Sequence, residues 1–169
     1  MYTHYIETDL YKIETLAKLR EDENWRFRSF LKGKNGHKVD VIVHRLNEEI
    51  SAKIDCTKCG NCCTKLSPCI TKNDLHNLSE ALKIPSSEVV EKYTETIEDE
   101  LSLKQLPCAF FADKKCTLYQ YRPETCHSYP HLHKKDFTSR LISVLSNYEI
   151  CPIVFNVYER LKDEMGFRR

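Results

Sequence analysis

The chain has 169 residues, a formal net charge of +1 and nine cysteines. This length predicts one domain with a core large enough to fold without disulfides. A nearly neutral charge gives no reason to expect nucleic acid or an anionic membrane surface as a partner. The sequence lacks the roughly 20 consecutive apolar residues of a membrane span and begins without signal-peptide features. We therefore expect a cytoplasmic protein without a membrane or nucleic-acid partner, and the nine cysteines are its unusual feature.

The first 54 residues contain no cysteine and are typical of helices. Apolar side chains recur at helical spacing over about residues 4–20 and again over residues 39–54. A shorter helix lies between these segments and ends near Gly33. We interpret residues 1–54 as an N-terminal helical extension, whose apolar stripe packs into the core.

Two further helices are predicted after the first cysteine run. Thr71 and Asp74 have the spacing of a capping box at a helix start. Pro85 ends this helix, and Ser86 or Ser87 is expected to cap the next one. The apolar residues expected to face inward are Leu75, Leu78, Leu82, Val89 or Val90, Tyr93 and Ile97.

The C-terminal half mixes short elements. Residues 108–119 predict a β-hairpin with a polar turn, and Arg122–Cys126 predicts the start of a short helix. Residues 136–146 are ambiguous between strand and helix, and we predict a strand. Cys151 and Pro152 open a last helix, which Gly166 ends.

Four of the cysteines form a run with the spacing C-x2-C-x2-C-C, namely Cys56, Cys59, Cys62 and Cys63. A two-residue spacer lets two thiolates reach one ion or cluster. Residues 55–70 hold only Leu66 and Ile70 as ordinary hydrophobic residues, which is too little apolar area to order the backbone. The pattern therefore favours metal binding over buried thiols, a disulfide scaffold or a thioredoxin-like motif.

The remaining cysteines lie farther along the chain, and we interpret Cys69 as a packed thiol outside any site. The eight candidate ligands are Cys56, Cys59, Cys62, Cys63, Cys108, Cys116, Cys126 and Cys151. Eight thiolates can form two four-thiolate sites, each suited to zinc or an iron–sulfur cluster. Adjacent side chains point apart, so Cys62 and Cys63 are expected to serve different sites or metal atoms. At least one site should join the first run to the later cysteines.

Three histidines follow Cys126 closely. His127, His131 and His133 could supply a ligand or an acid–base group, but their lysine-rich surroundings favour a solvated loop. The sequence as a whole predicts a mainly α fold with a small β-hairpin. We place a single cysteine-rich, metal-centred domain at residues 55–169.

Further motifs accompany the cysteines between about residues 54 and 155. They are Cys56-Thr-Lys-Cys59-Gly60-Asn-Cys62-Cys63, Thr71-Lys-Asn-Asp74-Leu75, Pro107-Cys108-Ala-Phe-Phe, Lys115-Cys116-Thr-Leu-Tyr119, Tyr121-Arg122-Pro123-Glu124-Thr125-Cys126, Tyr129-Pro130 and Cys151-Pro152. In combination they resemble the YkgJ-like cysteine-cluster family, a zinc- or iron-chelating domain of the CxxCxxCC type. The resemblance implies that the same eight cysteines are metal ligands. His127 departs from the arginine that is usual after that cysteine, and Cys69 lies outside the eight.

The function expected from these patterns is metal binding, with zinc or an iron–sulfur cluster held by eight thiolates and metal ions as the partner. A related cysteine cluster occurs in the flagellin lysine methylase, so the resemblance also implies an enzymatic use elsewhere in the family. Nothing in the sequence marks an S-adenosylmethionine site. The alternatives are an iron–sulfur redox enzyme, a protein-modifying enzyme similar to the lysine methylase, and an interaction module with purely structural zinc.

Overall fold

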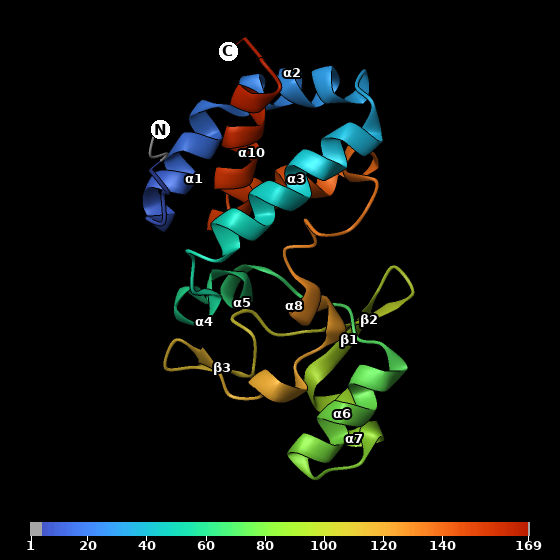
Figure 1. Cartoon of the computed structure of the whole chain (residues 1–169). Coiled ribbons are helices and arrows are strands. Elements are labelled where there is room, and N and C mark those ends of the chain that lie inside the picture. Colours follow the sequence, from blue (N-terminus) through green and yellow to red (C-terminus); the bar gives the residue numbers. More distant parts are fainter. Residues whose placement is uncertain (1–4, 169) are drawn as a thin grey trace. The chain divides into compact units, whose positions relative to one another are not determined.

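The computed structural model describes residues 5–168 and is mainly helical, with two antiparallel sheets of two strands each (Figure 1). The chain forms two compact units. The helical unit comprises the chain up to Asp55 and from Pro130 onward, and the cysteine unit comprises Cys56–Tyr129. The division expected from the sequence instead joins residues 130–169 to the cysteine region. The expected boundary between residues 1–54 and 55–169 stays a prediction.

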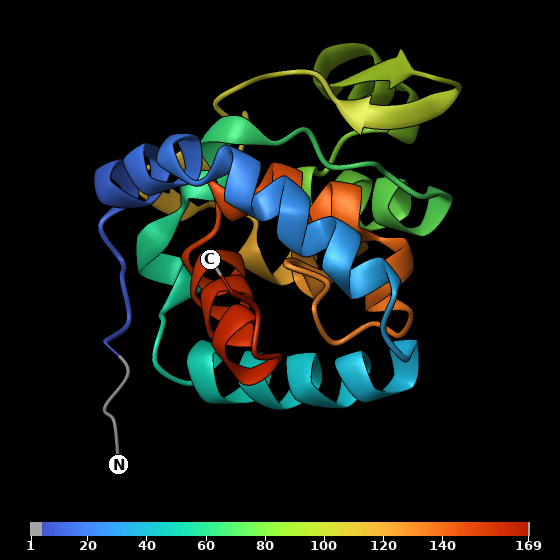
Figure 2. The same cartoon turned by 90° about the horizontal axis from the view of Figure 1, so that it is seen from above.

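The helical unit is built around its last helix, α10 (Pro152–Glu164), which contacts α1, α3 and α9. In Figure 2, α10 lies between the pair α1 and α2 on one side and α3 on the other. The other elements of this unit are α1 (Leu10–Leu19), α2 (Glu21–Lys32), α3 (Gly36–Ser51), the 3-10 helix η2 (Phe137–Ser139) and α9 (Leu141–Tyr148).

Helix formation in this unit follows the apolar periodicity, with two differences from expectation. Helix α1 begins at Leu10 because the Asp9 carboxylate caps it, accepting hydrogen bonds from the backbone of Tyr11 and Lys12. The expected start of that helix, residue 4, lies outside the described residues. The strand predicted over residues 136–146 is wrong, because that segment contains η2 and the start of α9. The buried residues of η2 and α9 recur at helical spacing and are Phe137, Leu141, Val144 and Tyr148.

The core of the helical unit combines apolar packing with a buried ion network. Phe27, Val43 and Leu46 have no exposed surface. Lys162 is also fully buried, and its Nζ donates to Glu23 at 2.7 Å and to Glu159 at 2.6 Å. A buried ammonium group needs such partners because desolvation disfavours an isolated charge.

A buried aspartate fixes the start of η2 to helix α3. Both oxygens of Asp40 accept backbone hydrogen bonds at 2.9 Å, one from Asp136 and one from Phe137. Asp40 thereby holds a segment almost 100 residues away in sequence against α3. Such a bond satisfies N–H groups at a helix start that have no partner within the helix.

The cysteine unit consists of short elements. They are α4 (Cys56–Cys59), α5 (Asn61–Lys65), α6 (Lys72–Leu82), α7 (Ser86–Tyr93), β1 (Thr94–Ile97), β2 (Glu100–Leu103), β3 (Phe111–Ala112), β4 (Lys115–Cys116), the 3-10 helix η1 (Tyr119–Tyr121) and α8 (Glu124–Ser128). The expected hairpin is β3–β4, and the hairpin β1–β2 was not expected. The segment before Thr71 holds two short helices rather than continuous irregular chain.

The capping box at Thr71 and Asp74 is confirmed, with both reciprocal bonds formed. The predicted cap of α7 is wrong, because Pro85 occupies the N-cap position and Ser86 is already the first helical residue. Ile97 does not face the core either, since it lies in β1 and is 46% exposed.

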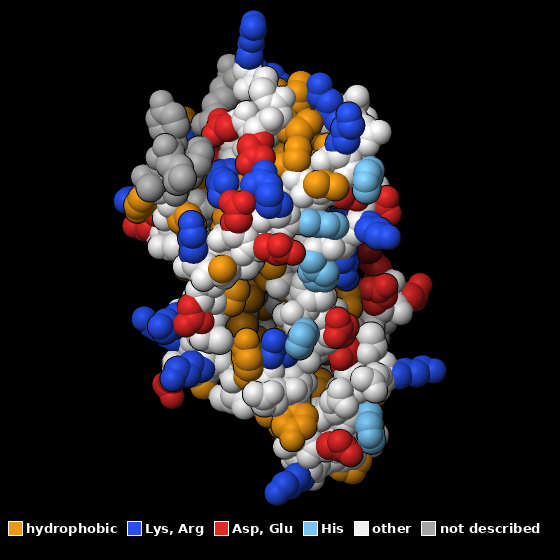
Figure 3. All heavy atoms as spheres, in the orientation of Figure 1, with side chains coloured by type: hydrophobic (Ala, Val, Ile, Leu, Met, Phe, Trp, Pro, Cys, Tyr) orange, Lys and Arg blue, Asp and Glu red, His pale blue; other side chains and the backbone are white. Residues whose placement is uncertain are grey.

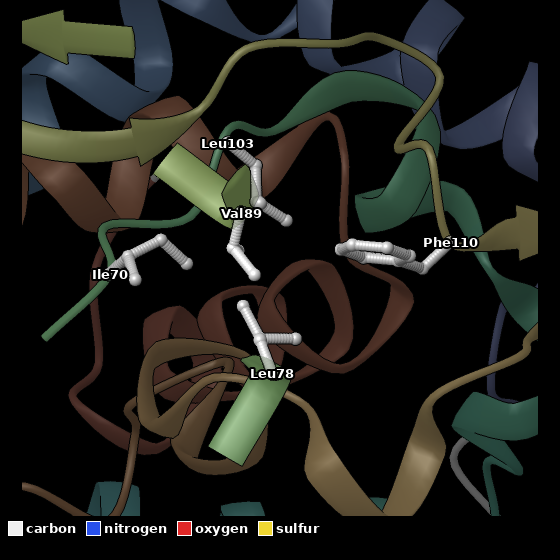
Figure 4. Packing of buried hydrophobic residues seen from close by; sticks show 5 residues of the cluster. All are labelled: Ile70, Leu78, Val89, Leu103 and Phe110. Atoms are coloured by element: carbon white, nitrogen blue, oxygen red, sulfur yellow. The ribbon is translucent and has the colours of Figure 1, made fainter. Parts of the chain in front are cut away.

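A small hydrophobic core holds the cysteine unit together. Five buried side chains point toward one another in Figure 4, namely Ile70, Leu78, Val89, Leu103 and Phe110. They come from the α6–α7 pair, from β2 and from the segments that precede α6 and β3. Cys108 packs against this core, partly buried, so a cysteine predicted to bind metal also borders apolar side chains.

The surface is mixed in charge. Figure 3 shows basic and acidic side chains interspersed over one face of the molecule, with small hydrophobic areas between them. Among the residues described, no single helix is both long and apolar enough to cross a membrane. Helices α9 and α10 meet those limits only together, and they are bent by 117° at the break between them.

Candidate metal centre

The first cysteine run lies on α4 and α5, which are joined at Gly60. Gly60 caps α5 in the left-handed conformation, with φ 60°. A Cβ atom at this position would lie 2.5 Å from Cζ of Phe111. Only glycine allows both this backbone conformation and this close approach. The turn between the two helices is therefore fitted against hairpin β3–β4, and α4 contacts β4 directly.

Backbone hydrogen bonds bring the later cysteines toward this run. The N–H of Cys108 donates to the carbonyl of Cys63 at 2.8 Å. Within the hairpin, Phe111 pairs with Cys116, and the N–H of Thr117 donates to the carbonyl of Phe110 at 2.8 Å. The backbone bond and the hairpin thus bring Cys108 and Cys116 near Cys63.

Four thiols interact as one group, which we call the thiol cluster: Cys63, Cys108, Cys116 and Cys126. Burial, followed by the charges of the other three cysteines, raises the pKa of Cys126 to about 12. Burial likewise raises the pKa of Cys108, followed by the charges of Cys63 and Cys116. A thiolate in this cluster is therefore disfavoured by its neighbours, as expected where several like charges share one small volume.

Other groups around the cluster favour the thiolate form. Backbone hydrogen bonds from Phe110 to Cys108 and from Leu118 to Cys116 lower the pKa of each thiol, against the larger effect of burial. In both cases the donor lies two residues after the cysteine. The Arg122 guanidinium also lowers the pKa of Cys116 and Cys126. Arg122 is held in place by the ring of Tyr119, 3.8 Å away, and by the Tyr119 carbonyl at 2.6 Å.

The adjacent thiols of Cys62 and Cys63 do not point apart as expected. A hydrogen bond to Cys62 raises the pKa of Cys63, followed by burial and the charge of Cys62. The two sulfur atoms are therefore neighbours, and Cys62 adjoins the thiol cluster. The assignment of these two residues to different metal atoms stays a prediction.

The other candidate ligands lie on different elements. Cys56 and Cys59 are the first and last residues of α4, with Cys56 exposed and Cys59 partly buried. Cys151 is the N-cap residue of α10 in the helical unit and is 6% exposed. Seven of the eight predicted ligands thus belong to the cysteine unit and one to the helical unit.

Cys69 lies outside the thiol cluster, and its interpretation as a packed thiol that takes no part in a metal site stays a prediction. Its Sγ donates to a carboxylate oxygen of Glu100 at 3.1 Å, and the Ser102 hydroxyl lies 3.8 Å from the sulfur. These contacts place Cys69 beside strand β2. It is partly buried rather than packed in the core.

The three histidines do not gather at the cluster as one group. His127 is an exposed residue of α8 in the cysteine unit, whereas His131 and His133 belong to the helical unit. His133 is exposed and His131 is half-buried with a left-handed backbone, φ 62°. The exposure of His127 and His133 agrees with the predicted solvated loop, whereas His131 is only partly exposed.

All nine cysteines are thiols in this structure, and no disulfide joins any of them. Within residues 5–168, no three histidine, cysteine or acidic side chains stand in an arrangement that could already hold a metal ion. The donor set of the cluster nevertheless fits zinc or an iron–sulfur centre, since four thiolate sulfurs are the ligands both prefer. The donated backbone hydrogen bonds and Arg122 are of the kind that stabilise such ligands.

Comparison with known proteins agrees with this chemistry. Residues 55–143 match the model of the CxxCxxCC family, described as "Putative zinc- or iron-chelating domain". The match spans more than half of the chain. This chain belongs to the CxxCxxCC family. The matched segment includes the entire thiol cluster, whereas Cys151 lies beyond its end.

A relative of this family member occurs in the archaeon Methanocaldococcus jannaschii, as an uncharacterized protein. The two chains are 37% identical over 81 residues, which is 45% of this chain and 43% of the relative. The chain therefore spans less than half the length of the relative it matches. No solved structure matches the chain.

Proposed function

We propose that this protein binds zinc or an iron–sulfur cluster through cysteine thiolates, with the thiol cluster as one four-thiolate site. The observation that supports this most directly is the mutual interaction of Cys63, Cys108, Cys116 and Cys126. These residues come from α5, from the two sides of a hairpin and from α8, so the grouping is a product of tertiary structure. Membership of a chelating family supports metal binding in general.

A bound cation would reverse the electrostatics of the cluster. In its absence each thiolate raises the free energy of the next, and burial adds to this effect. A divalent ion or a cationic iron–sulfur core attracts all four sulfurs and replaces their protons. When bound, it would supply a Lewis acid or an electron-accepting centre. The residues of this chain would orient the sulfurs and shield them from water.

The other four predicted ligands extend this proposal. Cys56, Cys59 and Cys62 lie on the two short helices that lead into Cys63, and Cys62 adjoins the thiol cluster. With Cys151, they complete the eight thiolates expected from the sequence. Eight thiolates predict two metal sites per chain, if each site takes four sulfurs.

The test is metal content after anaerobic purification, measured by elemental analysis together with the visible absorption spectrum. Cys116→Ser should lower the metal content, because it removes one sulfur of the thiol cluster. Cys69→Ser is the matched control, since it makes the same chemical change in the same unit at a thiol bonded to Glu100. Equal metal loss in both variants, or a metal-free unmodified protein, would contradict the proposal.

The same sample separates the functions that this site could serve. A coloured iron–sulfur cluster with reversible one-electron reduction would favour the redox enzyme. Zinc without spectroscopic signals would favour a structural role in an interaction module. The identity of the bound metal therefore distinguishes these classes of function.

A further inference from the structure

Asp74 is a buried carboxylate whose two oxygens have different partners. Its side chain belongs to the first turn of α6, and the residue is 3% exposed. Oδ2 accepts hydrogen bonds from the backbone N–H of Thr71 at 2.9 Å and from its hydroxyl at 2.6 Å. Oδ1 accepts a hydrogen bond at 2.9 Å from the backbone N–H of Glu124, which lies 50 residues later.

The capping of α6 accounts for the hydrogen bonds of only one of these oxygens, Oδ2. A capping box is complete once the N-cap side chain and the third helical residue bond to each other's backbone. Thr71 and Oδ2 of Asp74 already satisfy that requirement. The bond from Glu124 to Oδ1 is an additional link, formed with another helix.

The additional link fixes the helix that carries one thiol of the cluster. Glu124 is the first residue of α8, and Cys126 follows two residues later. The N–H groups at a helix start lack partners within their helix, so an acceptor there holds that end in place. A second bond joins the same two segments, from the Thr125 hydroxyl to the Cys69 carbonyl at 3.3 Å. Helix α8 is therefore fastened to the segment from Cys69 to Asp74.

We propose that Asp74 is a positioning residue of the metal centre, which holds Cys126 in place through the backbone of Glu124. The inference rests on the proposed function, since it assigns Asp74 a role toward the thiol cluster. Helix α6 is a firm base for this role, because Leu78 on the same helix is fully buried in the core. Groups that orient metal ligands in this way typically change metal affinity about 10–100-fold when removed.

Glu124 offers a clean way to break only this bond. Glu124→Pro removes the N–H at the first helical position, where proline is well tolerated. The preceding residue, Pro123, already has the extended backbone that precedes proline, with ψ 150°. Glu124→Ala is the matched control, because it removes the same exposed side chain and keeps the N–H.

The experiment measures zinc affinity by competition with a chelator in five variants: Glu124→Ala, Glu124→Pro, Asp74→Ala, Asp74→Asn and the double variant Asp74→Ala with Glu124→Pro. Glu124→Ala should bind within about threefold of the unmodified chain, and Glu124→Pro about tenfold more weakly. In the Asp74→Ala background, Glu124→Pro should have no further effect, because the bond is already lost. Asp74→Asn keeps one carbonyl oxygen for Glu124 and should restore most of the affinity.

Two results would overturn the inference. One is equal affinity in Glu124→Pro and Glu124→Ala, which would show that the bond does not position a ligand. The other is an additive loss in the double variant, which would show that Asp74 acts on stability alone. In both cases the unmodified chain still binds zinc, and only the role of Asp74 is wrong. An unmodified chain that binds no metal would contradict the proposed function itself, and the inference with it.

Discussion

The two units of this protein reach a stable fold by different means. The helical unit buries long helices against one another, and even its buried lysine, Lys162, is paired with two carboxylates. The cysteine unit has five buried hydrophobic residues in its core cluster and several partly buried thiols. We infer from this difference that burial alone can order the first unit, whereas metal ligation would add to the small core of the second by ordering its cysteine-bearing helices and hairpin.

The same hydrogen-bonding arrangement occurs in both units. A buried aspartate on a long helix accepts backbone hydrogen bonds at the start of a distant short helix, Asp40 for η2 and Asp74 for α8. In the helical unit this bond positions Phe137, a core residue with no exposed surface. In the cysteine unit the bond holds Glu124, and Cys126 follows two residues later in the same helix. The same bond therefore supports hydrophobic packing in one unit and the thiol cluster in the other.

The largest effect expected from this comparison follows metal removal. A structural metal site contributes about 10–16 kcal/mol of apparent binding energy that is coupled to folding. Chelation under reducing conditions should therefore expose the cysteine unit to cleavage at Lys58 or Lys65 and leave the helical unit protected. Limited proteolysis measures the cleavage. Amide hydrogen exchange with mass spectrometry measures, in one sample, the loss of protection expected in the cysteine unit and the protection expected to remain in the helical unit.

Cys126→Ser tests the same expectation without a chelator. The substitution removes one predicted ligand of the thiol cluster, and residue 126 lies far in sequence from Lys58. It should also accelerate cleavage of the segment between Cys56 and Lys65. Equal loss of protection in both units would contradict the distinction between them. Unchanged protection at Lys58 would show that α4 and α5 do not depend on the later cysteines.

A second effect should be confined to the helical unit. Lys162→Met removes the buried cation from the partly buried Glu23 and Glu159, and Glu159 keeps its ion pair with Arg20. Breaking a fully buried pair costs about 3–5 kcal/mol, so the loss here should reach at most that size. Denaturant unfolding should show this loss, while metal content stays unchanged. Lys18→Met is the control, because its ion pair with Glu14 is exposed to solvent and should matter little. A change in metal content in Lys162→Met would mean that the two units are not independent.

A smaller effect is expected at the turn between α4 and α5. Gly60→Ala places a side chain in a left-handed conformation, which costs about 1–2 kcal/mol, and it also displaces Phe111. Gly166→Ala has a similar backbone strain at φ 64° but meets no atom within 4 Å. Gly60→Ala should therefore lose more stability than Gly166→Ala and should weaken zinc binding, which chelator competition measures. Equal effects would show that the fit against Phe111 is unimportant.

Much of the fold could be predicted from local patterns. The helices around Ile13, Val43 and Leu78 follow from apolar periodicity, and the capping box at Thr71 follows from residues three positions apart. The prediction of a strand over residues 136–146 was wrong because a short apolar segment fits a strand and a helix about equally well. Hairpin β1–β2 was missed because Ile97 is exposed and the strand carries no buried alternation.

The sequence could predict which cysteines are candidate ligands but not which of them lie together in the folded chain. The spacing of Cys56 to Cys63 is a local signal, whereas the association of Cys63 with Cys126 depends on contacts across more than 60 residues. The supporting roles of Arg122 and Asp74 had no sequence signal apart from the motifs that contain them. The return of residues 130–169 to the N-terminal helices is likewise a long-range feature, which periodicity cannot reveal.

The central claim is that sulfur atoms of the thiol cluster bind one metal centre. X-ray absorption at the metal edge of anaerobically purified protein tests it most directly, because it counts and identifies the ligand atoms. We expect four sulfur ligands per metal, at about 2.3 Å if the metal is zinc. In Cys126→Ser one of these sulfurs should be lost or the metal should be absent. A metal bound mainly by nitrogen and oxygen, or an unchanged sulfur shell in Cys126→Ser, would contradict the account.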